Sequence, residues 1–203
     1  MSGRTGWQRI ARRIRVPLGF VFAAAFLGLA RPSWRTLAAS LLLVAPGLWM
    51  RAYASGYVRK DAELTTTGPY AHTRNPLYLG SMLIAFGFAA ASARWEILAA
   101  LAALFAAIYI PTIQSEEAYL RANFAGFDEY ARRVPRLLPR LRGASASDAA
   151  LPGVGTSARG RFSSELYLRH REYNSAMGAG AIYLALVLRL LSPLLLRLLH
   201  PAR

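Results

Sequence analysis

The sequence predicts an all-α, polytopic helical membrane protein with four transmembrane helices and a fifth apolar helix near the C-terminus. The first observation is composition: of 203 residues, 55% are hydrophobic and only 17% are charged, which is too apolar for the surface of a water-soluble domain. The second is distribution. The apolar residues form separate runs whose lengths approach the roughly 20 residues that cross a bilayer.

The positive charge is placed as a membrane protein places it. The formal net charge is +15, and Lys60 is the only lysine among the basic residues. Arginines gather before the first apolar run and after the fourth, namely Arg4, Arg9, Arg12, Arg13 and Arg15, then Arg132, Arg133, Arg136, Arg140 and Arg142. Such flanking charge orients spans and binds lipid headgroups. Without a basic face interleaved with aromatic residues, no nucleic-acid partner is expected.

Residues 1–54 are predicted to form an N-terminal transmembrane hairpin. Its two apolar runs are Val16–Ala30 and Trp34–Met50, and the short polar sequence Arg31-Pro32-Ser33 joins them. The first run follows a basic stretch, as a signal peptide does, but it leads directly into another apolar run and not into a cleavage site and a soluble domain. We therefore expect two antiparallel helices.

Residues 55–142 are predicted to be the catalytic membrane subdomain, with a second hairpin formed by Leu77–Ala93 and Trp95–Ile113. If the arginine-rich N-terminus is cytoplasmic, the polar segments 51–76 and 114–142 share the cytoplasmic side. A site assembled from these two segments opens to the cytosol.

The remaining chain is predicted to be a linker and a distal helical segment. Residues 143–160 are rich in glycine, serine and alanine and show no periodicity, which is typical of a flexible linker. In the segment 161–203, the apolar run Ala176–Leu188 is followed by Arg189. This run either spans the membrane, with Arg189 snorkelling or facing protein, or lies at the interface.

The first block of candidate functional residues precedes the third apolar run. Asn75-Pro76 is a strong helix start, because Asn is a good N-cap and Pro lacks the N–H that would be unpaired at the first helical position. The helix N-terminus and the adjacent Arg74 favour an anionic group. Gly80 lets a ligand or a neighbouring helix approach closely. The alternative is ordinary capping, with Arg74 bound to lipid phosphate.

The second block, Glu116-Glu117, directly follows the fourth apolar run. Adjacent helical residues point about 100° apart, so one carboxylate can face a cleft while the other supports it from the flank. The alternative for Glu117 is an ion pair with Arg121 one turn later. Pro111, about a turn earlier, is expected to bend the helix beside the pair.

Together these blocks resemble a known family. The first reads Gly68-Pro69-Tyr70, then Arg74-Asn75-Pro76, Tyr78 and Gly80; the second reads Glu116-Glu117 and Leu120, then Phe124, Phe127, Tyr130 and Val134-Pro135-Arg136. Their order beside apolar runs is similar to that of the isoprenylcysteine carboxyl methyltransferase and phospholipid N-methyltransferase superfamily, over about residues 55–140. The distal sequence around Tyr167 and His170-Arg171-Glu172-Tyr173 resembles the tail of bacterial members.

The resemblance implies a multi-pass enzyme of the bacterial inner membrane that uses S-adenosyl-L-methionine, with the active site facing the cytoplasm. It places Arg74, Asn75 and Glu117 in catalysis. It implies cofactor contacts from both blocks, at Tyr70, His72, Tyr78, Leu79, Gly80, Glu116, Glu117 and Tyr130. The expected acceptor is lipid-like or amphiphilic, and membrane lipids are the expected partners.

One departure from the family bears on the acceptor. The family commonly has Arg-His-Pro where this chain has Arg74-Asn75-Pro76, and Asn cannot titrate as a base. This favours an acceptor that is already deprotonated, such as a carboxylate, over an amine. His72 is close enough in sequence to take the role of the missing histidine.

Two other functions stay open at the level of sequence. One is an NADPH-dependent membrane reductase like the steroid 5-alpha-reductases, in which the arginines bind phosphates. The other is a non-catalytic membrane protein in which both blocks are helix caps and headgroup contacts. No metal is expected, because the chain has no cysteine and its three histidines, His72, His170 and His200, are scattered.

Overall fold

The computed structural model describes residues 21–59, 63–142 and 161–199, and every regular element within these ranges is a helix. The all-α fold is therefore confirmed. The predicted linker 143–160 and the start of the first apolar run lie outside the described residues. The elements are a helix over 21–29, α2 (Trp34–Ser55), the 3₁₀ helix η1 (Gly68–Ala71), α3 (Pro76–Ala91), α4 (Trp95–Asn123), α5 (Phe127–Arg133), α6 (Ser164–Arg169) and α7 (Tyr173–Leu199).

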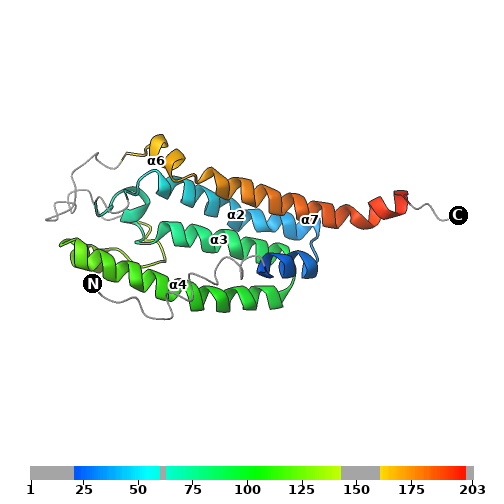
Figure 1. Ribbon diagram of the computed structural model, residues 1–203, viewed down its shortest axis with the longest axis horizontal. Helices are drawn as coiled ribbons and strands as arrows, with labels where there is room; N and C mark the ends of the chain where they lie inside the picture. The colour runs from blue at the N-terminus through cyan, green and yellow to red at the C-terminus, as the bar shows by residue number, and fades with distance from the viewer. Residues whose placement is uncertain (1–20, 60–62, 143–160, 200–203) are drawn as a thin grey trace.

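The long helices form an elongated bundle in which α3 lies between α2 and α4, and α7 runs along α2 (Figure 1). Three of them, α2, α4 and α7 as far as Ser192, are long and apolar enough to cross a membrane. Helix α3 has 16 residues, which is about 24 Å at 1.5 Å per residue and shorter than the hydrocarbon core. The helix that contains the fourth apolar run continues well beyond Ile113, because α4 extends to Asn123.

Helices α2 and α3 pack closely through glycine. A Cβ on Gly80 would lie 2.8 Å from the carbonyl oxygen of Gly47, and a Cβ on Gly47 would lie 2.8 Å from the carbonyl oxygen of Gly80. Small residues allow such approach where helices associate in lipid, because hydrophobic burial offers little driving force there. Of the two roles expected for Gly80, the structure shows the approach of a neighbouring helix.

The turns of the two hairpins are joined to each other at one end of the bundle. Ser33 and Thr36 form a capping box at the start of α2. The hydroxyl of Thr36 also donates to the carbonyl of Ala91 at 3.1 Å, and the amide of Arg31 donates to the carbonyl of Ser92 at 2.8 Å. These bonds fix the two hairpins relative to each other at the end opposite the long polar segments.

The turn after α3 contains a left-handed alanine, Ala93, with φ 52°. A Cβ disfavours this conformation by about 1–2 kcal/mol, and glycine adopts it freely. We expect Ala93→Gly to stabilise the protein by about 0.5–1 kcal/mol, seen as a higher thermal unfolding midpoint in detergent. The matched change Ala90→Gly, within helix α3, should lower the midpoint. A lower midpoint for Ala93→Gly would contradict this account of the turn.

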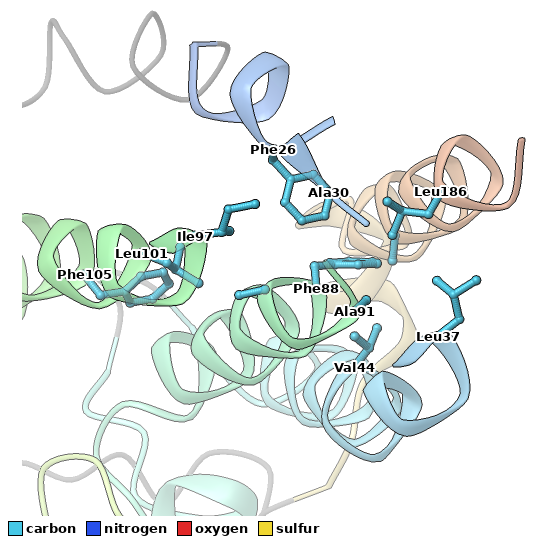
Figure 2. Packing of buried hydrophobic residues seen from close by; sticks show 12 residues of the cluster. Phe26, Ala30, Leu37, Val44, Phe88, Ala91, Ile97, Leu101, Phe105 and Leu186 are labelled. Atoms are coloured by element: carbon cyan, nitrogen blue, oxygen red, sulfur yellow. The ribbon is translucent and has the colours of Figure 1, made fainter. Parts of the chain in front are cut away.

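The main hydrophobic core joins all the long helices. Figure 2 shows Phe26 and Ala30 beside Phe88 of α3 and Leu186 of α7, while Ile97, Leu101 and Phe105 follow one face of α4. This core takes residues from both hairpins and from α7. It therefore fixes the positions of these helices relative to one another, including the ends that carry the polar segments.

Helix α7 continues through Arg189 without interruption. The guanidinium of Arg189 donates to the carbonyls of Leu27 and Gly28, the latter at 2.8 Å. These carbonyls lie in the last turn of the 21–29 helix, where a cation is favoured. The side chain of Arg189 is exposed but contacts protein, which is one of the arrangements expected from the sequence.

Candidate functional site

A cavity of about 700 Å³ lies where the two polar blocks meet. Its walls come from the end of α2 and the following segment, from η1 and the first turns of α3, from α4, from α5 and from the turn before α7. Six of the residues predicted from sequence line it: Tyr70, Arg74, Asn75, Tyr78, Glu116 and Tyr130.

The wall formed by α4 changes from apolar to polar along its length. Its lining residues repeat every three or four positions and so share one helix face: Leu104, Phe105, Ile108, Tyr109, Thr112, Glu116, Tyr119 and Leu120. The apolar members Leu104, Phe105 and Ile108 come first, Thr112 and Glu116 follow toward the C-terminal end of the helix, and Leu120 lies beyond them. The cavity therefore suits a ligand with an apolar part and a polar part.

The structure separates the two adjacent glutamates. Glu116 lines the cavity, and one of its carboxylate oxygens accepts a hydrogen bond from the hydroxyl of Tyr78 at 2.7 Å. The ring of Tyr78 packs edge-to-face on Tyr109, with centroids 5.3 Å apart. This contact joins the first turn of α3 to α4 across the cavity and orients a carboxylate toward it.

Glu117 is 5% exposed and lies behind the cavity wall. Its carboxylate contacts the guanidinium of Arg74 at 3.1 Å and that of Arg136 at 2.7 Å. The hydrogen bond and charge of Glu117 raise the pKa of Arg136. The alternative pair with Arg121 does not form, because Arg121 contacts Asp128 at 2.7 Å. Glu117 thus holds Arg74 in the cavity wall and does not itself line the cavity.

Arg74 keeps one hydrogen-bond donor free. Its Nε is buried and has no hydrogen-bond partner among the described residues, although its terminal nitrogens contact Glu117 and the carbonyl of Ala131. An unpaired buried donor costs free energy. Because Arg74 lines the cavity, its guanidinium gives this wall a positive charge, where an anionic ligand group can bind.

The segment before α3 pairs with the segment after α5. The amide of Arg74 donates to the carbonyl of Pro135 at 2.9 Å, and the side-chain amide of Asn75 donates to the carbonyl of Arg136 at 2.9 Å. Asn75 is the N-cap residue of α3, but its side chain makes no capping bond because this contact engages it instead. The pairing builds one wall from two distant parts of the sequence.

Two buried tyrosines form the floor. The hydroxyl of Tyr130 donates to the carbonyl of Tyr70 at 2.8 Å. Burial is the main cause that raises the pKa of both phenols, so both are neutral at physiological pH. They offer aromatic surface and no charge to a ligand.

Four predicted site residues lie outside the described lining: His72, Leu79, Gly80 and Glu117. Nδ1 of His72 is 2.8 Å from the carbonyl oxygen of Arg140. Gly80 faces α2, as described above. No histidine is therefore among the lining residues that the structure describes.

Sequence reasoning missed Arg51 and Glu172, both of which line the cavity. Arg51 follows the apolar run ending at Met50 and reads as an ordinary flanking charge. Glu172 lies in the distal segment, 121 positions away. The motif around His170 was its only signal in the sequence. In the described ranges, no group of three or more His, Cys, Asp or Glu residues could hold a metal ion.

The chain is similar to two proteins that are named for metal resistance. The chain is 41% identical over 112 residues to the nickel-cobalt-cadmium resistance protein NccN of Alcaligenes xylosoxydans xylosoxydans, covering 55% of this chain and 52% of that protein. It is 37% identical over 138 residues to the cobalt-zinc-cadmium resistance protein CzcN of Cupriavidus metallidurans, covering 63% of this chain and 62% of that protein. The chain thus matches little more than half the length of these relatives.

No solved structure matches the chain. The profile of the phospholipid methyltransferase family matches residues 23–126, which include most of the first hairpin, the second hairpin, the Arg74–Gly80 block and Glu116-Glu117. That is just over half of the chain, and the helices of the bundle agree with a membrane protein of this kind. The chain is a membrane protein that belongs to the phospholipid methyltransferase family.

Proposed function

We propose that this protein is an S-adenosylmethionine-dependent membrane methyltransferase that acts on an amphiphilic acceptor. The observation that carries the proposal is one cavity in which Arg74, Tyr78 and Glu116 meet at the polar end of an apolar wall. The family match supports methyl transfer. The polarity of the cavity supports an acceptor with an apolar body.

The lining residues fit the functional groups of S-adenosylmethionine, which when bound supplies a methyl group on a sulfonium. The guanidinium of Arg74 suits the carboxylate, Glu116 suits the ammonium or the ribose hydroxyls, and the rings of Tyr70, Tyr78 and Tyr130 suit the adenine. In this assignment Glu117 positions Arg74. The protein's main task in this assignment is to align the two reactants.

The same cavity suits an acceptor whose nucleophile is already deprotonated. Asn75 uses its side-chain amide to bind the carbonyl of Arg136 and cannot accept a proton as a base. His72 contacts the opposite segment. We therefore propose a lipid-like carboxylate as the acceptor, with its apolar part against Leu104, Phe105 and Ile108 of α4.

Cofactor binding to the detergent-purified protein tests this function. We expect S-adenosylmethionine to bind in calorimetry and to raise the thermal unfolding midpoint, and NADPH to do neither. A shift with NADPH alone would replace methyl transfer with a reductase, and no shift with either compound would favour a non-catalytic membrane protein.

Replacing Glu116 with glutamine should weaken S-adenosylmethionine binding at least tenfold. The change keeps the shape and the contact with Tyr78 but removes a charge that faces a cationic ligand, and hydrogen bonds to charged groups contribute about 1.5–3 kcal/mol. The matched control is Glu96→Gln, at the exposed start of the same helix, which should leave the dissociation constant unchanged. Equal affinities for Glu116→Gln and the wild type would remove Glu116 from the site.

A further inference from the structure

The C-terminal segment 161–199 lies beyond the part of the chain that matches the family, yet its first part runs along α2 (Figure 1). The amide of Ser163 donates to the carbonyl of Gly56 at 2.9 Å, and Nδ1 of His170 is 3.0 Å from the carbonyl oxygen of Ser55. Farther along, the hydroxyls of Tyr183 and Ser40 are 2.7 Å apart. These contacts bring the start of α7 to the cavity.

At that point Glu172 forms a two-pronged ion pair with Arg51. Its Oε1 is 2.8 Å from Nη2 and its Oε2 is 3.1 Å from Nε. Ser175 donates to the same carboxylate at 3.1 Å. The side chains of Arg51 and Glu172 are only 23% and 11% exposed, and both line the cavity. A charge pair in this position acts on a ligand with little screening by water.

Arg51 links Glu172 to α3, which forms another wall of the cavity. Its Nη1 donates to the hydroxyl of Ser81 and to the carbonyl of Leu77, both in the first turns of α3. Glu172 is thereby connected, through one guanidinium, to the helix that presents Tyr78 to Glu116. The C-terminal segment is joined to the polar end of the cavity and not only to the outer surface of α2.

The backbone beside Glu172 is held in an unfavourable conformation. Arg171, between α6 and α7, has φ 52°, a value that costs a residue with a Cβ about 1 kcal/mol or more. This turn directs the chain from α6 into α7 and places the next residue, Glu172, at the cavity. Such strain persists only where the surrounding contacts fix the conformation.

Glu172 and Glu116 act across the same space. Burial is the main cause of the raised pKa of Tyr70. The charges of both carboxylates raise this pKa further, and the charge of Arg51 lowers it. Among the described lining residues, three arginines (Arg51, Arg59 and Arg74) balance three glutamates (Glu63, Glu116 and Glu172). Removing the charge of Glu172 would leave these groups with a net positive charge.

We infer that Glu172 is a specificity-determining residue of the cavity, supplied by the C-terminal segment, which favours a cationic cofactor over its neutral product. The inference rests on the proposed function. S-adenosylmethionine carries one positive charge more than S-adenosylhomocysteine, at sulfur. A carboxylate on the cavity wall therefore stabilises the first relative to the second.

Dissociation constants for both compounds test the inference in the full-length, detergent-purified protein. Glu172→Gln should weaken S-adenosylmethionine about tenfold, as expected for loss of one charge at roughly 10 Å with an effective dielectric constant near 20, and should change S-adenosylhomocysteine less than twofold. Glu165→Gln, an equal change of charge on exposed α6, should affect neither. Glu172→Asp keeps the charge and should retain the wild-type preference.

Equal losses for the two compounds, or a lower unfolding temperature with unchanged affinities, would make Glu172 a structural tie between α2 and α7 and overturn the inference alone. A wild-type protein that binds neither compound would instead overturn the proposed function, and the inference with it.

Discussion

Replacing Glu117 with alanine should destabilise the protein by about 3–5 kcal/mol, the usual cost of removing one partner from a buried ion pair. Glu117 is 5% exposed, and its carboxylate contacts both Arg74 and Arg136. Without it, two guanidinium groups lose their countercharge, and the side chain of Arg74 is itself only 12% exposed. Chemical denaturation in detergent measures the loss.

The same change should abolish S-adenosylmethionine binding, because Arg74 loses the contact that fixes it in the cavity wall. Glu129→Ala is the control, since Glu129 pairs with Arg132 and Arg133 at the surface and should contribute little to stability. If the Glu117→Ala protein unfolds at the same denaturant concentration as the wild type and binds the cofactor equally well, the account is wrong. Arg74 and Arg136 then do not need the carboxylate of Glu117.

Replacing Gly80 with alanine should destabilise the protein by about 1–3 kcal/mol, although alanine is the better helix former. The added Cβ would lie 2.8 Å from the carbonyl oxygen of Gly47 and 2.7 Å from Cγ of Arg51. Helix α2 must then move away from α3. Because Arg51 lies at this contact and lines the cavity, ligand affinity should fall together with the unfolding midpoint.

Gly178→Ala provides the matched control on α7, where an added Cβ meets nothing within 4 Å. Here the gain in helix propensity should act alone and raise the midpoint slightly. If Gly80→Ala lowers the unfolding midpoint and Gly178→Ala raises it, close packing between α2 and α3 is what requires a glycine at position 80. Equal stabilisation at both positions would show that the helices can separate without cost.

Much of the architecture could be read from local sequence. The apolar runs predict helices because a backbone in lipid must satisfy its own hydrogen bonds. Asn75-Pro76 correctly predicts the start of α3, and Arg189 was expected to need a protein partner or the interface. The two polar blocks were expected to meet, because antiparallel hairpins return both to one side of the bundle.

Assigning tasks within those blocks required the packed bundle. The pattern Glu116-Glu117 says that one carboxylate faces the cleft, but the rotation of α4 decides that it is Glu116. Gly80 allowed either a ligand or a helix, and the position of α2 decides for the helix. Helix rotation depends on contacts along the whole helix and is not encoded in two adjacent residues.

The sequence by itself determined the helical membrane class, the family motifs and their gathering at one end of the bundle, since each depends on composition or on neighbours a few residues apart. Only the tertiary structure joined Arg51 to Glu172, two residues 121 positions apart. No periodicity relates such residues. Their contact exists because α7 packs along α2, and that packing is a property of the assembled bundle.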